Sequence, residues 1–152
     1  MSNFLIKLFS TFFYVGYLPF IPGTFGSIAG IIIFFLLRNN FFLYLWLTWL
    51  VMLLGFLVAG EAEKIFGKKD AGCIVIDEAS GMLLSLAFIP YDIRLVIIAF
   101  GLFRILDALK PYPAGLLQNL KGSLGVMSDD LVAALYTNII LQVVLRGVSF
   151  KA

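Results

Sequence analysis

Long apolar stretches without charge alternate with short polar segments along this chain. The most distinct stretch, residues 39–60, contains 22 residues and no charge. At about 1.5 Å per residue, a helix of that length crosses a hydrocarbon core of about 30 Å. Residues 24–37 predict a shorter partner helix, which needs tilting or shielding by its neighbours. Residues 131–145 predict a last apolar helix. Residues 1–13 predict a short amphipathic or interfacial helix, with a break at 16–22 and a polar connection at 61–78.

The region 79–103 allows two interpretations. Apolar residues fill 79–89 and 95–103, with Pro90, Tyr91 and Asp92 between them. One long helix kinked at Pro90 would place the acids at 70–78 and those at 107–130 on opposite membrane faces. Two short helices in a hairpin would place both groups of acids on one face. We favour the hairpin, mainly because it brings the acids together.

The distribution of positive charge agrees weakly with acidic loops in the cytoplasm. With the hairpin, one side carries seven cations and the other four, and cytoplasmic loops are enriched in Lys and Arg. The seven are Lys7, Lys64, Lys68, Lys69, Arg104, Lys110 and Lys121, and the four are Arg38, Arg94, Arg146 and Lys151.

The composition is that of a membrane protein. Hydrophobic residues make up 62% and charged residues 13% of the 152 residues, and the mean hydropathy is +1.05. Soluble domains are nearer half apolar and a quarter charged. The fold class is therefore expected to be all-α, a polytopic helical bundle with short or re-entrant helices, forming one domain over 1–152. A net charge of +2 without a basic block argues against nucleic-acid binding.

Several catalytic chemistries are excluded by residues that the chain lacks. It contains no histidine, which removes histidine acid–base catalysis and the Ser-His-Asp triad. Cys73 is the single cysteine, and the arginine that a cysteine phosphatase needs six positions later is Ala79. Carboxylates, hydroxyls, lysine, arginine and a hard cation remain.

The first of three polar clusters is a Pro- and Gly-rich turn at 18–27, just before an apolar helix. Thr24 and Ser27 place hydroxyls beside the free amides of a helix start, which can hold an anion. The structural alternative is that Thr24 only caps the helix, and that Gly26 and Gly30 allow close helix packing.

The second and third clusters are acidic. The second contains Asp70, Asp77 and Glu78, and the third begins with Arg104, Asp107 and Lys110 at a spacing of three residues. The third continues to Asp129 and Asp130, just before the last apolar helix. The structural alternative for the acids is that they only stabilise helix starts, with Ser128 as an N-cap. The structural alternative for Arg104 and Asp107 is an ion pair within one helix.

Together the clusters predict a metal and phosphate site. If the acids converge, their mutual repulsion requires a cation, and oxygen ligands suit Mg²⁺, Mn²⁺ or Ca²⁺. Cations beside the Thr24 turn then suit a phosphate. The six acids in the clusters, out of nine in the chain, are Asp70, Asp77, Glu78, Asp107, Asp129 and Asp130.

Four ordered segments resemble the phosphatidylglycerophosphatase A family. They are LPFIPGTFGS at 18–27, D-x6-DE-x2-G at 70–81, FRxxDxxKPYP at 103–113 and GVMSDD at 125–130. They cover the chain from about residue 18 to 134. The family's double glycine before the last segment is Gly122-Ser123 here, a departure that leaves the acids in place.

The resemblance implies an all-helical, Mg²⁺-dependent phosphatase of the bacterial inner membrane, multi-pass, with its site facing the cytoplasm. The substrate would be phosphatidylglycerophosphate, and the products phosphatidylglycerol and phosphate. The hypothesis assigns Mg²⁺ to Glu78, Asp129 and Asp130 with Asp77, Asp107 or Asp70 in support. It assigns phosphate binding to Thr24, Ser27, Arg104 and Lys110, and catalytic roles to Asp77, Asp107 and Thr24. A water activated at the metal is the preferred nucleophile, and an aspartyl-phosphate at Asp77 or Asp107 is the rival.

Three other classes are weighed against the phosphatase. Another membrane enzyme that acts on phospholipid head groups, such as a CDP-alcohol transferase, is disfavoured. The spaced acidic motif of those transferases is absent from this chain. A small transporter or channel would use the carboxylates as a cation path, and would spread them across the bilayer. In a structural subunit the acids would only cap helices.

Overall fold

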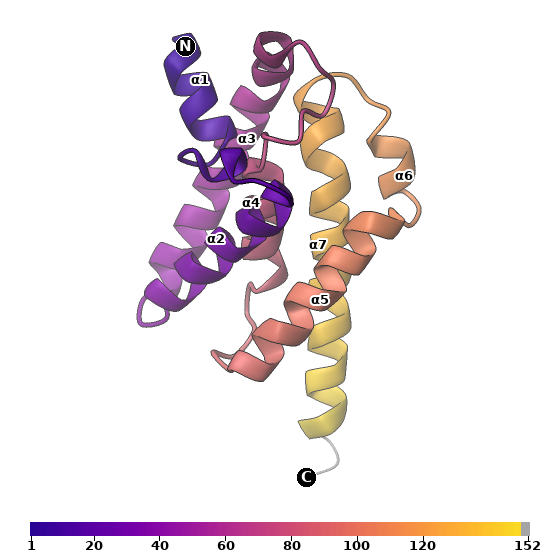
Figure 1. Ribbon diagram of the computed structural model, residues 1–152. Helices are drawn as coiled ribbons and strands as arrows, with labels where there is room; N and C mark the ends of the chain where they lie inside the picture. The colour runs from indigo at the N-terminus through magenta and orange to yellow at the C-terminus, as the bar shows by residue number, and fades with distance from the viewer. Residues whose placement is uncertain (150–152) are drawn as a thin grey trace.

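The described part of the chain is entirely helical. A computed structural model describes residues 1–149, with side chains through residue 147, and contains seven α-helices, one 3₁₀ turn and no strand in that part (Figure 1). Lys151, counted above among the cations, lies outside the described residues. The elements are α1 (Asn3–Ser10), η1 (Val15–Tyr17), α2 (Pro22–Leu36), α3 (Phe41–Phe66), α4 (Ile76–Ser85), α5 (Ile93–Leu109), α6 (Ala114–Leu117) and α7 (Ser123–Ser149). The all-α prediction is confirmed for these residues.

Two helices are long and apolar enough to cross a membrane. They are Phe41–Phe66, with a mean hydropathy of 2.3, and Ser123–Gly147, with 1.4. Only 28% of the most apolar window of α3 is buried within the protein, against 56% for α7. The difference follows from position, because α7 contacts α3, α4, α5 and α6, whereas α3 presents much of its surface outward.

α4 is a short central helix, and α2 packs closely against it. Eight of its ten residues are buried. A Cβ added at Gly26 would lie 2.8 Å from the Val75 carbonyl oxygen, and one at Gly30 would lie 2.8 Å from that of Ala79. The packing role expected for Gly26 and Gly30 is thereby confirmed. Only hydrogen at these two positions allows the backbones this approach.

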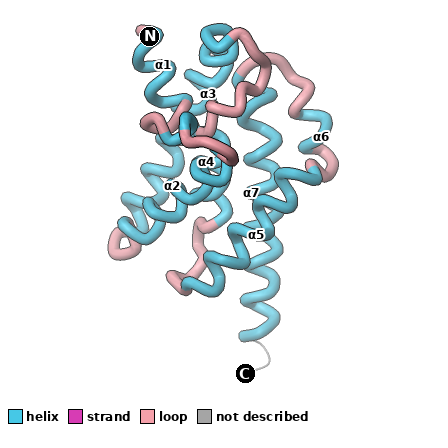
Figure 2. Tube along the Cα trace, in the orientation of Figure 1, coloured by secondary structure: helices cyan, strands magenta, loops and turns pink. Residues whose placement is uncertain are grey.

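α4 and α5 are two separate helices rather than one kinked helix. Residues 86–92 connect them, and the tube in Figure 2 shows α5 rising back past α4 and across α7. The first turn of α4 and the last turns of α5 therefore lie near the same part of α7. The hairpin favoured from the sequence is confirmed.

Two predicted boundaries are wrong, and in both cases the helix extends into charged sequence. α3 continues to Phe66 and ends at Gly67 with a φ of +66°, so only residues 67–75 form the connection predicted at 61–78. α7 begins at Ser123 instead of residue 131, so Ser128 is no N-cap and Asp129 lies inside the helix. Charge does not end these helices because their charged side chains find partners. In α3 Glu61 pairs with Lys64 one turn later, and in α7 Asp129 pairs with Lys110 from the end of α5.

Candidate active site

Three carboxyl groups from two helices meet in the interior. Asp77 and Glu78 lie in the first turn of α4, and Asp130 lies on α7. One oxygen from each lies within 4.8 Å of the other two. Asp77 is 5% exposed and Asp130 is 4% exposed. Asp77 Oδ1, Glu78 Oε2 and Asp130 Oδ2 are buried without a hydrogen-bond partner, an arrangement that costs free energy unless a further group binds there.

The carboxyl groups in the first turn of α4 favour the binding of a cation. Burial raises the pKa of Asp77 well above its ordinary value, and the nearby charges of Glu78 and Asp130 raise it further. Burial also raises the pKa of Glu78, against the opposing effect of Arg104. A divalent ion would replace the lost hydration and separate the like charges. Oxygen-only donors fit a hard cation, so these three residues fit a divalent metal.

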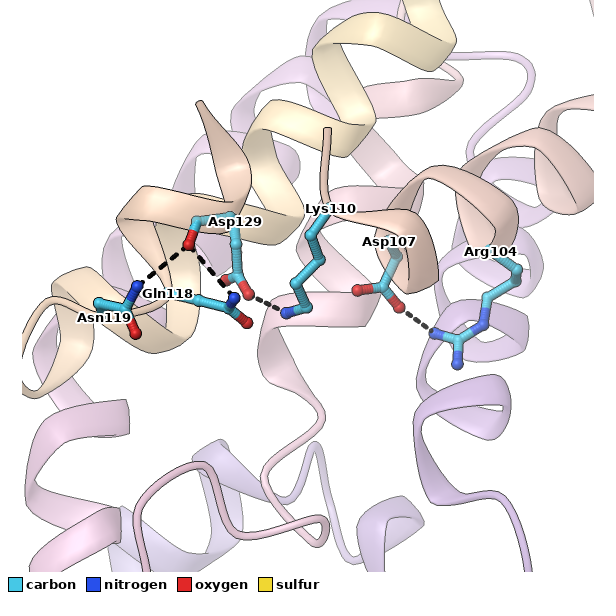
Figure 3. Close-up of polar contacts among 7 residues, drawn as sticks. Arg104, Asp107, Lys110, Gln118, Asn119 and Asp129 are labelled. Carbon is cyan, nitrogen blue, oxygen red and sulfur yellow. Dashed lines mark hydrogen bonds and ion pairs between the residues drawn. The ribbon is translucent and has the colours of Figure 1, made fainter. Parts of the chain in front are cut away.

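An ion pair on α5 lies beside this group. Arg104 Nη1 is 3.0 Å from Asp107 Oδ2, so the pairing expected from their spacing is confirmed (Figure 3). The start of α2 contacts the same place. A Cβ added at Gly23 would lie 2.1 Å from Glu78 Oε1 and 3.5 Å from Arg104 Nη1. The glycine of the turn thus lets the α2 backbone reach the acidic group.

A second ion pair joins the end of α5 to α7. Lys110 follows α5 in the left-handed conformation, with a φ of +45°, and its Nζ donates to Asp129 Oδ2. Burial by itself lowers the pKa of Lys110, but the hydrogen bond to Asp129 and the nearby acids outweigh it and raise that pKa overall. The ammonium therefore stays charged. Figure 3 shows Asp107 and Asp129 on either side of Lys110, in one row of charged groups.

The two hydroxyls predicted to bind phosphate, those of Thr24 and Ser27, differ in how deeply they are buried. α2 begins at Pro22 with Ile21 before it, so Thr24 lies in the first turn and the capping alternative is wrong. Ser27 is fully buried, and its hydroxyl donates to the Gly23 carbonyl at 3.1 Å. Thr24 is half-buried on the turn that contacts Glu78. Phosphate binding by either residue stays a prediction.

Two predicted metal ligands lie outside the group of three. Asp129 is engaged by Lys110, although its Oδ1 is buried without a partner. Asp70 is exposed in the connection before α4, and its N–H donates to Glu63 Oε1 at 2.7 Å. Both acids line a polar pocket of about 210 Å³ beside the ion pair of Lys110. Their roles as ligands stay predictions.

Sequence reasoning missed four residues of the site region. Lys69, Gln118 and Asn119 line the polar pocket, and Gly23 permits the contact with Glu78. Lys69 directly precedes the predicted site segment at 70–81, and Gln118 and Asn119 lie a few residues after the one at 103–113, so nearness in sequence was the available signal. The contact of Gly23 depends on the tertiary arrangement alone.

The comparisons with known proteins agree with the resemblance found in the sequence. A family model described as phosphatidylglycerophosphatase A matches residues 8–145, a span that includes every candidate site residue named above. A Haemophilus influenzae protein named phosphatidylglycerophosphatase A is 37% identical over 124 residues, covering 79% of this chain and 76% of its own length. A protein of the same name from Escherichia coli is 37% identical over 121 residues, covering 78% and 70%.

A further relative carries a different name. A Bacteroides thetaiotaomicron protein provisionally named phosphatidylinositol-3-phosphatase is 38% identical over 152 residues, covering 93% of this chain and 94% of its own length. No solved structure matches the chain significantly.

Proposed function

The chain belongs to the phosphatidylglycerophosphatase A family, and on this premise we propose that it removes the terminal phosphate of phosphatidylglycerophosphate. The products are phosphatidylglycerol and inorganic phosphate, so the protein is a phosphoric monoester hydrolase of phospholipid biosynthesis. The observation that carries the proposal is the meeting of three acids, two buried and one half-buried, with two cations nearby. Asp77, Glu78 and Asp130 supply the acids, and Arg104 and Lys110 supply the cations.

Asp77, Glu78 and Asp130 would hold Mg²⁺. Their unpartnered oxygens and the absence of nitrogen or sulfur donors from the group support this choice. When bound, the ion neutralises phosphate oxygens and stabilises the leaving glycerol oxygen.

The protein's own cations bind and orient the phosphate. Arg104 presents planar N–H donors that match phosphate oxygens, and Lys110 presents a charged ammonium. In the structure each cation is held by a carboxylate, Asp107 and Asp129 respectively. These pairs fix the cations before substrate arrives, so less side-chain entropy is lost on binding. Thr24, at the start of α2, adds a hydroxyl donor.

The nucleophile is either water or a carboxylate. Asp107 is paired with Arg104, whereas Asp77 has an unpartnered oxygen, so Asp77 is the better placed of the two candidate carboxylates. A single turnover in ¹⁸O-labelled water tests the carboxylate route. Label found only in phosphate fits both routes, because water can also attack an aspartyl-phosphate at phosphorus. Label found on Asp77, with none in the first phosphate released, supports an aspartyl-phosphate.

We further propose a multi-pass arrangement of one domain over 1–152. α3 and α7 cross the bilayer, while the α4–α5 hairpin enters from one side and returns to it. The apolar surface of α3 supports this arrangement. The acidic site then faces the cytoplasm of a bacterial inner membrane, and the acyl chains of the substrate stay in lipid.

A second candidate substrate is phosphatidylinositol 3-phosphate. The name of the Bacteroides relative favours it, and that relative covers more of this chain than the two phosphatidylglycerophosphatases do. Both lipids carry a phosphomonoester on a polyol head group, so the same acids and cations suit either.

Phosphate release from purified full-length protein in mixed micelles tests the proposal. We expect release from phosphatidylglycerophosphate that stops with EDTA and returns with Mg²⁺, and that is faster than release from phosphatidylinositol 3-phosphate. Release from the inositol lipid alone would favour the second candidate. No release from either lipid, with Mg²⁺ present, would contradict the phosphatase and favour a transporter or a structural subunit.

A further inference from the structure

A polar pocket lies beside the ion pair of Lys110 and Asp129, and the group of three acids is not part of its lining. Its volume is about 210 Å³. It is formed by the connection before α4, the end of α6 and the first turns of α7. The residues that line it are Lys69, Asp70, Gln118, Asn119, Gly125, Val126 and Asp129.

Asp129 lines this pocket, and one of its carboxylate oxygens is buried without a donor. Asp129 is 5% exposed, and its Oδ2 accepts from Lys110. Its Oδ1 is buried and has no hydrogen-bond partner. An ionised carboxylate oxygen only accepts hydrogen bonds. A ligand that satisfies Oδ1 must therefore bring a donor, which an ionised phosphate oxygen cannot do.

Two side-chain amides that also line the pocket are held in place. Gln118 Nε2 donates to the Gly115 carbonyl oxygen at 3.2 Å, and Asn119 Nδ2 donates to the same oxygen at 3.1 Å. Figure 3 shows both amides beside Asp129. Each amide has two N–H donors and one acceptor oxygen. A donor and an acceptor therefore remain on each amide after the bond to Gly115, in an orientation that the bond restricts.

The charge of the pocket disfavours a second anion. Lys69 is the one cation among the lining residues, against the carboxylates of Asp70 and Asp129. Lys110 offsets Asp129 from outside the lining. The lining therefore combines acceptors and donors without net positive charge. A hydroxyl group, which donates and accepts at once, complements such a lining.

We propose that this pocket binds the hydroxyl-bearing polyol that links the cleaved phosphate to the lipid, and that Gln118 and Asn119 determine head-group specificity. The inference rests on the proposed function, since the phosphate must lie at Arg104 and Lys110 for its polyol to reach Asp129. Asp129 then connects the two sites, with one oxygen toward Lys110 and one toward the substrate hydroxyl. A phosphomonoester attached directly to diacylglycerol leaves the pocket unused.

The test compares two lipids that differ by this polyol. Phosphatidylglycerophosphate carries glycerol between its phosphates, and phosphatidic acid does not. Gln118→Leu removes the amide with little change in size. We expect a KM for phosphatidylglycerophosphate raised about fivefold to tenfold, as for the loss of one hydrogen bond. The inhibition constant of phosphatidic acid, measured as a competitor, should change by less than about twofold.

Gln142→Leu provides the matched control. Gln142 also makes one local side-chain hydrogen bond, to Asn138 Oδ1 at 2.7 Å, but on α7 outside the pocket. It should leave both constants unchanged. Equal weakening of both lipids by Gln118→Leu, or no change in either, would overturn the pocket assignment. Wild-type protein that releases no phosphate from phosphatidylglycerophosphate would instead overturn the proposed function, and the inference with it.

Discussion

The acidic site and the outer surface of α3 reverse the usual relation between polarity and burial. Asp77 and Asp130 are 5% and 4% exposed. On α3, by contrast, Trp46 is 75% exposed and Leu53 is 58% exposed. In a soluble domain the charged groups would be outside and the large apolar groups inside.

This contrast indicates that the two regions have different surroundings. An apolar surface as extensive as that of α3 is stable when lipid covers it. Buried carboxylates with unpartnered oxygens are stable when a cation binds them. The exposed apolar surface of α3 thus favours a lipid environment, and the group of acids favours a bound cation. Four substitutions test the two regions separately.

Glu78→Gln should have the largest effect. It removes one charge from the proposed metal site, and phosphate release should fall about 10²- to 10³-fold, the size seen for the loss of one central electrostatic contact. The fold should persist, because one of three mutually repelling charges is gone. Steady-state phosphate release and thermal unfolding in detergent measure both effects. Glu61→Gln, at an exposed acid paired with Lys64, is the control and should be silent. Full activity of Glu78→Gln would remove this residue from the site.

Leu53→Lys tests the other region. Leu53 lies midway along α3 with an outward side chain. A lysine at the centre of a bilayer costs about 2.5–3.5 kcal/mol, whereas on a water-facing surface it costs little. We expect reduced membrane insertion, measured by fractionation of expressing cells. Leu43→Lys, near the start of the same helix, is the matched control and should insert nearly normally. Equal insertion of both variants would show that water, not lipid, covers α3.

Gly23→Ala should have an intermediate effect on the acidic site alone. The added Cβ would lie 2.1 Å from Glu78 Oε1, which must move. Because the displaced group is the end of a side chain, we expect the helices to stay folded and kcat/KM to fall about tenfold. Gly101→Ala on α5 is the control, since nothing lies within 4 Å of its added Cβ. If both variants keep wild-type kinetics, the contact between α2 and Glu78 has no catalytic role.

Tyr44→Phe should have the smallest effect, on stability alone. The buried Tyr44 hydroxyl of α3 donates to the Leu83 carbonyl oxygen of α4. Its loss should lower the free energy of unfolding by about 1 kcal/mol and leave phosphate release unchanged. Thermal unfolding measures the change. Tyr136→Phe, whose exposed hydroxyl donates to the Tyr112 carbonyl at 2.8 Å, should cost less. A large loss of activity in Tyr44→Phe would mean that the two regions are coupled.

Local sequence predicted the helices well where apolar runs are long and uninterrupted. The run at 39–60 became the main part of α3, and the break before Pro22 separates η1 from α2. It failed at helix ends that carry charge. The interaction of Lys110 with Asp129 stabilises charges inside or beside helices, but it joins residues 19 positions apart. No local pattern reports such a partner.

The candidate site was predictable as a set of residues but not as an arrangement. The spacing of Arg104 and Asp107 indicated their ion pair, because neighbours on a helix face each other. The choice of Asp130 rather than Asp129 as companion of Glu78 was not predictable. Adjacent residues on α7 point about 100° apart, and only the packing of α4 decides which one faces it.

The amino-acid sequence alone predicted a helical chain, too apolar for a surface covered by water alone, whose side chains available for chemistry are carboxylates, hydroxyls, lysine and arginine. Composition and local spacing contain that information directly. Only the folded arrangement showed which acids lie together, that Lys110 pairs with Asp129, and where a polar pocket opens beside that pair. These outcomes depend on how α2, α4, α5 and α7 pack, and packing is set by contacts between residues far apart in the chain.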